Sequence, residues 1–250
     1  MSVRLFRCLW LVVWLGASAA QAQPLAVAAA TSLRDALPEV GRLFTAENPG
    51  IELNFVFAAS GSLLRQIAQD TPADVFASDD LQTMDRGVAR RLIDPSTRTE
   101  FASNALVLIV PATSAAKLTQ LRDLLDIGVR RIAVGSPDNV PAGRYARAAL
   151  DSQRLWTALR PKLVFASDVR QVLDEVARAE VDAGFVYRSD ALREAGAVRV
   201  DLVLQLAAPV LYPIARVADS PQPQAADRFI RFVKSPAAQA VLARHGFSAP

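Results

Sequence analysis

The chain has 250 residues, of which 28 are Lys or Arg and 25 are Asp or Glu, and its formal net charge is +3. A balance so close to neutral gives no indication of nucleic-acid or membrane-surface binding. The single cysteine, Cys8, and the single histidine, His245, exclude a metal centre built from thiolates or imidazoles.

The first 22 residues have the pattern of a secretory signal peptide. A positively charged start precedes the apolar run 8–15, and residues 20–22 read Ala-Gln-Ala, an A-x-A cleavage site. The run is too short to span a bilayer comfortably, which argues against the alternative of a retained membrane anchor. We expect cleavage after Ala22, so that the exported chain begins at Gln23 in the periplasm, without cysteine and nearly neutral.

Short apolar strands and amphipathic helices alternate along the rest of the chain. Val169, Val172 and Val176, for example, recur with the spacing of one helix face. Gly246 follows the last helical pattern and is a candidate helix cap. Strands that alternate with helices predict an α/β protein with parallel or mixed sheets. The predicted strands are residues 25–30, 51–57, 75–76, 104–110, 131–134, 163–166, 183–187, 198–206 and 212–217.

The first helical pattern contains a conflict. If the helix began at Ser32, Pro38 would lie in its interior, where a proline costs about 3 kcal/mol. We therefore expect the helix to be kinked at this point or to begin at Leu37.

Two strands end in serine at the point where a helix begins. Thr31 and Ser32 follow the first predicted strand, and Ser60 and Ser62 follow the second. A helix start offers unpaired backbone N–H groups and the positive end of its dipole, to which a serine adds a hydroxyl donor. Two such corners facing each other would form a neutral pocket of donors that suits an anion. A serine taken alone is more often an ordinary helix cap.

Three further donors follow the same logic in the second half of the chain. Ala142 and Val169 lie at predicted helix starts, directly after Pro141 and Asp168, and Tyr187 ends a predicted strand with a hydroxyl. Each of these residues alone has an ordinary structural role. Together with the serines, in an exported α/β protein, they indicate a site for an anion.

Other chemistries fit the sequence less well. A Ser-His-acid hydrolase would need His245, and the segment around Ser60 lacks the G-x-S-x-G elbow. Asp79 and Asp80 are candidates for a hard cation, but they lack the spacing of a calcium loop, and helix capping is the favoured role. No glycine pattern for nucleotide binding is present. We therefore expect no cofactor, no bare metal cation and no enzymatic activity.

Six segments, spread over essentially the whole exported chain, form one recognisable set. They are A-A-A-T-S-L at 28–33, F-A-A-S-G-S-L-L-R-Q-I at 57–67, P-A-D-V-F-A-S at 72–78, V-P-A-G-R-Y-A at 140–146, D-V-R at 168–170 and V-Y-R-S-D-A at 186–191. With these segments the chain resembles the periplasmic molybdate-binding proteins that feed ABC transporters, and the last three segments are the more specific ones for molybdate and tungstate.

The resemblance implies an α/β protein with the two-lobed type II periplasmic binding protein fold. Each lobe would be a mixed or parallel sheet flanked by helices, with the ligand in the cleft between the lobes. Residues 23–102 and 213–250 would form lobe one, and residues 103–212 would form lobe two.

The resemblance also implies a monomeric receptor that binds molybdate or tungstate without a charged side chain and delivers it to an inner-membrane ABC permease. No nucleic acid would be a partner. The implied ligand donors are hydroxyl and backbone groups of Ser32 and Ser60 from lobe one, the backbone N–H groups of Ala142 and Val169, and the hydroxyl of Tyr187 from lobe two.

The sequence departs from the family pattern at Arg34 and Asp35, where Thr-Asn is common. We expect the Asp35 carboxylate to point outward in the first turn of its helix, where it favours the dipole. Two alternatives stay open. One is a receptor for another tetrahedral oxyanion such as sulfate, and the other, with less support, is an exported serine hydrolase that uses Ser32 or Ser60.

Overall fold

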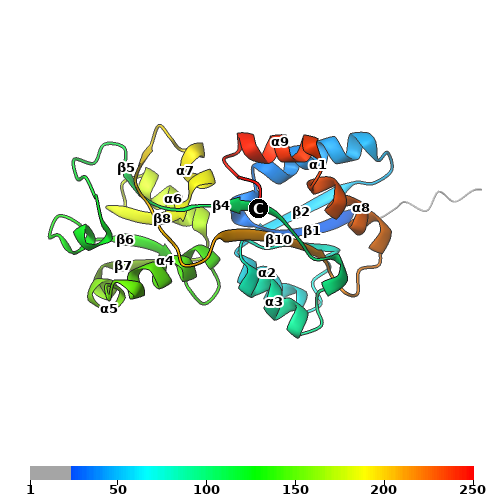
Figure 1. Cartoon of the computed structure of the whole chain (residues 1–250), viewed down its shortest axis with the longest axis horizontal. Helices are drawn as coiled ribbons and strands as arrows, with labels where there is room; N and C mark the ends of the chain where they lie inside the picture. The colour runs from blue at the N-terminus through cyan, green and yellow to red at the C-terminus, as the bar shows by residue number, and fades with distance from the viewer. Residues whose placement is uncertain (1–23) are drawn as a thin grey trace, which may run out of the picture.

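The computed structural model describes residues 24–250, which form two five-stranded sheets side by side along the longest axis of the molecule (Figure 1). The predicted signal peptide and its cleavage site lie outside the described residues. In spatial order the first sheet contains β2 (Leu53–Ala58), β1 (Leu25–Ala30), β3 (Val75–Ala77), β10 (Val210–Arg216) and β4 (Thr99–Asn104). The second contains β7 (Leu163–Ala166), β6 (Ile132–Gly135), β8 (Ala183–Tyr187), β5 (Leu106–Pro111) and β9 (Val198–Val203).

Both sheets have the same internal arrangement. In the first, β1 is parallel to β2 and β3, and β10 is antiparallel to β3 and β4. In the second, β6 is parallel to β7 and β8, and β5 is antiparallel to β8 and β9. The prediction of parallel or mixed sheets is therefore confirmed. The three parallel strands of each sheet end at one shared edge.

The chain passes between the sheets twice. It leaves the first sheet between β4 and β5, where Ala105 alone separates the two strands, and it returns between β9 and β10 (Figure 1). The last residues of the chain also reach this crossing, because Ser248 pairs with Ser103 of β4. Three segments that are far apart in the sequence thus meet where the two sheets adjoin.

Helices cover both faces of each sheet (Figure 1). In the part of the chain that the structure describes, no helix combines the length and hydropathy needed to cross a bilayer. The α-helices are α1 (Ala36–Glu47), α2 (Ser60–Ile67), α3 (Leu81–Ala89), α4 (Pro141–Ser152), α5 (Trp156–Leu159), α6 (Val169–Ala177), α7 (Arg188–Arg193), α8 (Pro223–Val233) and α9 (Pro236–Arg244). The 3-10 helices are η1 (Thr31–Leu33), η2 (Pro95–Thr97), η3 (Leu121–Leu125) and η4 (Arg160–Lys162).

Apolar packing joins the sheets to their helices. On the first sheet, the Phe44 ring of α1 meets the Phe229 ring of α8 edge to face, with 5.3 Å between the ring centroids. In the second sheet, every residue of β5 is buried, as expected for a strand covered on both faces. Burial of this apolar surface is the main stabilising contribution to a fold without disulfides.

Most predicted strands are confirmed, and three of them, 25–30, 163–166 and 183–187, coincide with β1, β7 and β8. Sequence analysis does not predict β4, because its sequence TEFASN buries only Phe101 and Ala102 and shows no apolar alternation. The predicted strand 104–110 is in fact divided. Asn104 ends β4, and β5 begins two residues later.

The conflict at Pro38 is resolved by two separate helical segments. Thr31–Leu33 form the short 3-10 helix η1, and α1 begins at Ala36. Pro38 is therefore the third residue of α1, where a backbone N–H would have no acceptor within the helix. The proline removes no hydrogen bond there, and the expectation of a late helix start is confirmed to within one residue.

Candidate functional site

The five residues predicted to bind an anion all lie where a parallel strand gives way to a helix. Ser32 lies in η1 after β1, and Ser60 is the first residue of α2 after β2. In the second sheet, Ala142 is the second residue of α4, Val169 is the first of α6, and Tyr187 is the last of β8. Ligands of open α/β sheets bind at this strand edge. All five residues are buried, and none exposes more than 4% of its surface.

Neither serine is a helix cap. The residue at the cap position is Ala30 for η1 and Ala59 for α2. The Ser32 hydroxyl instead contacts Tyr212 of β10, and the Ser60 hydroxyl contacts Asp79, two residues beyond the end of β3. The alternative that these serines serve only as caps is therefore wrong.

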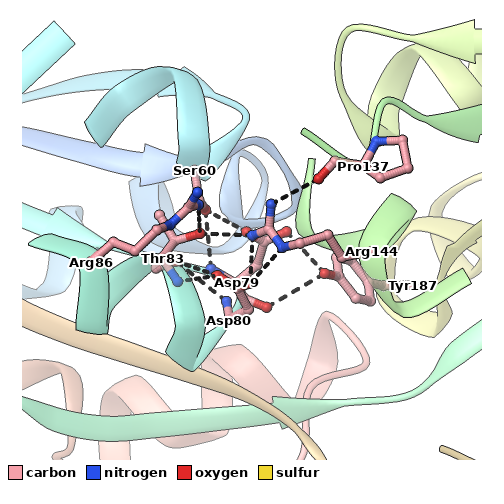
Figure 2. A network of polar contacts seen from close by, with 9 residues as sticks. Ser60, Asp79, Asp80, Thr83, Arg86, Pro137, Arg144 and Tyr187 are labelled. Carbon is pink, nitrogen blue, oxygen red and sulfur yellow. Dashed lines mark hydrogen bonds and ion pairs between the residues drawn. The ribbon is translucent and has the colours of Figure 1, made fainter. Parts of the chain in front are cut away.

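Ser60 and Tyr187, which belong to different sheets, converge on one carboxylate (Figure 2). The Ser60 hydroxyl donates to Oδ1 of Asp79, and the Tyr187 hydroxyl donates to Oδ2 at 3.0 Å. The backbone N–H of Asp79 donates in turn to Ser60 Oγ at 3.2 Å. Asp79 is buried at the carboxyl end of β3, so the structure joins two of the predicted donors through a buried anionic group.

The surroundings of Asp79 make its charged form less favourable than it is in water. Burial raises the pKa of the Asp79 carboxyl to about 6, the negative charge of Asp80 adds to the rise, and the hydrogen bonds from Ser60 and Tyr187 oppose it. Burial also raises the pKa of the Tyr187 hydroxyl well above its ordinary value. The tyrosine therefore remains a protonated donor at neutral pH.

Ser32 joins the same region through a second tyrosine. Ser32 Oγ and the Tyr212 hydroxyl lie 3.1 Å apart, and Asn104 Nδ2 donates to that hydroxyl at 3.3 Å. The rings of Tyr212 and Tyr187 pack edge to face with centroids 5.8 Å apart. Ser32, Ser60 and Tyr187 thus form one connected group.

Ala142 and Val169 have no side chain that could join that group by a hydrogen bond, although both share the buried apolar cluster of Tyr187. They offer backbone N–H groups instead, because the first residues of a helix carry N–H groups without an intrahelical acceptor. Asp168 caps α6 by accepting from the N–H groups of Arg170 and Gln171. This cap does not use the N–H of Val169, the first residue of the helix. The α6 helix also packs against η1 of the first sheet.

Direct contacts hold the helix starts of the two sheets together. The N–H of Gly61 donates to the Asn139 carbonyl at 3.0 Å, and a Cβ atom at Gly61 would lie 2.6 Å from that oxygen. Arg144 of α4 pairs with Asp80 at 2.5 Å, close to Asp79 (Figure 2). The two sheets are thus in close contact around the predicted donors.

Asp35 does not behave as expected. It occupies the cap position of α1, but its side chain makes no capping bond. Its carboxylate pairs instead with Arg170, at 2.6 Å, and with Arg193, both on the second sheet's side. Burial would raise the pKa of Asp35, yet the hydrogen bonds from Arg193 and Arg170 bring it below its ordinary value. The charge is therefore neutralised by partners across the interface.

Some buried donors in this region have no partner among the described residues. Thr31 Oγ1 and the Nε and Nη1 atoms of Arg170 are buried without a hydrogen bond. A buried donor without an acceptor is costly. These atoms lie on η1 and α6, the elements that carry Ser32 and Val169, so they are donors that an additional acceptor would satisfy.

The alternative chemistries find little support in the geometry. The ring of His245 bonds Glu39 at 2.9 Å, whereas the two candidate nucleophiles, Ser32 and Ser60, contact Tyr212 and Asp79. Among residues 24–250, no cluster of three or more His, Cys, Asp or Glu side chains is arranged to hold a metal ion. Asp80 caps α3 by accepting from the Thr83 N–H, as predicted for the Asp79 and Asp80 pair, but Asp79 does not cap.

Sequence reasoning missed Asp79 and Tyr212 as members of the site. The same reasoning that singled out Ser32 and Ser60, a polar residue at the end of a predicted strand, applies to Asp79 after β3. No local signal identifies Tyr212, because it is 180 residues from Ser32 and reaches it only through the sheet order.

A family model described as a bacterial extracellular solute-binding protein matches residues 25–248. The chain belongs to that family. The molybdate-binding protein ModA of Escherichia coli (strain K12) is 37% identical over 231 residues, which cover 90% of this chain and 88% of that protein. The resemblance to the periplasmic molybdate-binding proteins is therefore confirmed.

Solved structures agree with this assignment. The substrate-binding domain of a putative molybdenum ABC transporter from Clostridium difficile is 32% identical, with a TM-score of 0.69, over 91% of this chain and 99% of that chain. The sulfate-binding protein SubI from Mycobacterium tuberculosis H37Rv has a TM-score of 0.79 at 20% identity, over 91% of this chain and 87% of its own, a likeness of fold alone. The architecture is the type II periplasmic binding protein fold, in a family of solute-binding rather than enzymatic proteins.

Proposed function

We propose that this protein is an extracytoplasmic receptor that binds molybdate or tungstate and delivers the oxyanion to an ABC transporter permease. The names of the relatives support this choice of ligand. In this proposal the signal peptide is removed after Ala22, and the mature protein acts in the periplasm as a monomer without cofactor or catalysis.

One observation carries the proposal. The hydroxyls of Ser60 and Tyr187, which come from different sheets, donate to the two oxygens of one buried anionic group, Asp79. A site in which donors from both sides converge on anionic oxygens is suited to an oxyanion. The unpartnered Thr31 hydroxyl beside Ser32 supplies a further buried donor.

The oxyanion would lie between lobe one, residues 23–102 and 213–250, and lobe two, residues 103–212. Lobe one would donate through side-chain and backbone groups of Ser32 and Ser60. Lobe two would donate through the backbone N–H groups of Ala142 and Val169 and the Tyr187 hydroxyl. The contacts between the two sheets support a closed arrangement in which both sets reach one ligand.

The chemistry of the donors favours a fully deprotonated oxyanion. Molybdate near neutral pH only accepts hydrogen bonds, so hydroxyl and amide donors satisfy it without leaving an unpaired group. Phosphate retains a proton on part of its molecules, and an O–H buried without an acceptor costs about 1–3 kcal/mol. Sulfate has the same charge and the same acceptors as molybdate, so only its smaller size distinguishes it.

Isothermal titration of the purified mature protein with molybdate, tungstate, sulfate and phosphate tests the proposal. We expect saturable binding of molybdate and tungstate with one site per chain, and weaker binding of sulfate and phosphate. Sulfate binding more tightly than molybdate would establish the alternative receptor, and a protein that binds none of the four anions would refute the receptor function. Turnover of a chromogenic ester, lost in Ser60→Ala, would instead identify a hydrolase.

A further inference from the structure

The Asp79 carboxylate uses the same hydroxyls that the proposed function assigns to the ligand. Ser60 and Tyr187 both donate to it, and each hydroxyl has a single proton to donate (Figure 2). While both hydroxyls donate their hydrogen bonds to Asp79, neither can donate to an oxyanion. Asp79 therefore competes with any acceptor-only ligand for the same donors.

The charges around Asp79 make a second anion unfavourable beside it. Asp80 follows it directly, and Arg144, the cation whose charge acts on Asp79, is already paired with Asp80. Like charges repel strongly in a buried site, because the local dielectric constant is low. The titratable groups that face Asp79 are Asp80 on its own segment, Arg144 and Tyr145 of α4, Tyr187 of β8, Asp190 of α7 and Tyr212 of β10.

Resting on the proposed function, we propose that Asp79 couples oxyanion binding to the uptake of one proton. The deprotonated carboxylate occupies the Ser60 and Tyr187 donors, and the oxyanion binds when Asp79 has taken up a proton from solvent. The neutral carboxyl group no longer repels the ligand, and its new O–H becomes a donor itself. Asp79 is thus a specificity-determining residue that gives this receptor a pH-dependent affinity.

Two further features support this coupling. The raised pKa of Asp79, about 6, means that protonation near neutral pH is accessible. Asp79 is also buried, with 3% of its surface exposed, and its backbone N–H is bonded to Ser60 Oγ, so its side chain has little room to turn away from the site.

The test is isothermal titration of the mature protein with molybdate between pH 6 and pH 8, in two buffers of different ionisation enthalpy. Apparent affinity scales with the competent fraction of the receptor, here the protonated fraction. The parent should therefore lose about tenfold in affinity from pH 7 to pH 8 and take up about one proton per ligand at pH 8.

Two variants sharpen the test. Asp79→Asn imitates the neutral carboxyl group, so it should bind about as tightly at pH 8 as at pH 6, with no proton uptake. Asp85→Asn changes an exposed carboxylate on the neighbouring helix α3, with a side chain 61% exposed, and should behave like the parent.

The outcomes separate this inference from the proposed function. If the parent binds molybdate with constant affinity and no proton uptake from pH 6 to pH 8, the coupling is refuted and the receptor function stands. If Asp79→Asn binds more weakly than the parent at pH 8, the competition is refuted. If phosphate binds better than molybdate, Asp79 is an acceptor for a protonated ligand, and both proposals fail. Proton uptake by the parent needs no variant, so the test does not depend on Asp79→Asn folding.

Discussion

The two sheets present different kinds of donor at their common edge. Ser32 and Ser60 of the first sheet offer hydroxyls, whereas Ala142 and Val169 of the second offer only backbone N–H groups at helix starts. Tyr187 is the one predicted hydroxyl on the second side. A side-chain substitution can remove the hydroxyl donors of the first sheet, but the backbone donors survive any such change. The two sides of the site therefore call for different experiments.

The largest expected effect comes from a ligand that joins both sides. At a thousandfold excess of molybdate over its dissociation constant, binding should stabilise the fold by about 4 kcal/mol. For a chain of this size that corresponds to a rise of roughly 10 °C in melting temperature. Calorimetry with and without molybdate checks this. A transition that divides in two, with one part unmoved by ligand, would mean that only one sheet contributes donors.

The second prediction concerns the stability that the ligand-free protein loses when the buried Asp79 carboxyl group ionises. Its pKa is raised from 3.8 to about 6, so the folded state binds this proton more tightly than the unfolded state does. The resulting stability is fully present below pH 4 and is lost as the pH rises through about 6, for a total of about 3 kcal/mol.

Urea denaturation of the parent and of Asp79→Asn between pH 4 and pH 8 measures this pH-dependent contribution of Asp79 to the free energy of unfolding. The variant should lose less stability than the parent over that range. Part of the slope should remain, because burial also raises the pKa of Asp190 to about 7. Asp85→Asn, an exposed control, should retain the parent's full slope. Parallel curves for the parent and Asp79→Asn would show that the carboxylate is not destabilised by burial.

The third prediction concerns the loss of molybdate affinity when the hydroxyl donors of the first sheet are removed. Ser32→Ala and Ser60→Ala should each weaken molybdate binding by roughly 1.5–3 kcal/mol, the range for hydrogen bonds to a charged group. This equals about a tenfold to hundredfold loss. Ser60→Ala should fall at the lower end, because the Ser60 hydroxyl leaves one anionic partner, Asp79, for another.

Ser62→Ala is the matched control for both serines. Its hydroxyl accepts from the exposed Arg65, and Ser62 lies two residues after Ser60 in α2, about half a helical turn around from it. Titration should give the parent's affinity for this variant. Full affinity in Ser32→Ala and Ser60→Ala would show that the two serine hydroxyls do not bind the ligand, which would leave the backbone donors and the Tyr187 hydroxyl to hold it.

The difference between the two sheets also explains what the sequence could predict. Ser32 and Ser60 stand out because a hydroxyl at a strand end is a donor by residue type. Ala142 and Val169 are apolar, so their role depends on backbone geometry, and the sequence points to them only through the predicted helix starts and through the resemblance to a family. The sequence predicts one role for Asp79 and Asp80 together, as helix cap or cation ligand, yet the fold turns Asp80 toward α3 and Asp79 toward Tyr187. That separation depends on contacts between the sheets, which no local pattern encodes.

The smallest effect concerns the distance between the two sides rather than any donor. The N–H of Gly61, beside Ser60, bonds the Asn139 carbonyl, and a Cβ at Gly61 would lie only 2.6 Å from that oxygen. The conflict is with backbone atoms, so a rotamer change cannot relieve it. Gly61→Ala should therefore hold the helix starts of the two sheets slightly apart and weaken molybdate binding by about 1 kcal/mol, the low end for overpacking.

Gly196→Ala is the control, because a Cβ at Gly196 would meet no atom within 4 Å. It should leave affinity unchanged. Both variants keep every donor, so a difference between them in the dissociation constant for molybdate reports the fit of the two sides alone. If Gly61→Ala binds as tightly as Gly196→Ala, the contact between Gly61 and Asn139 is not needed in the bound state. The ligand would then be held with the two sheets further apart than they are here.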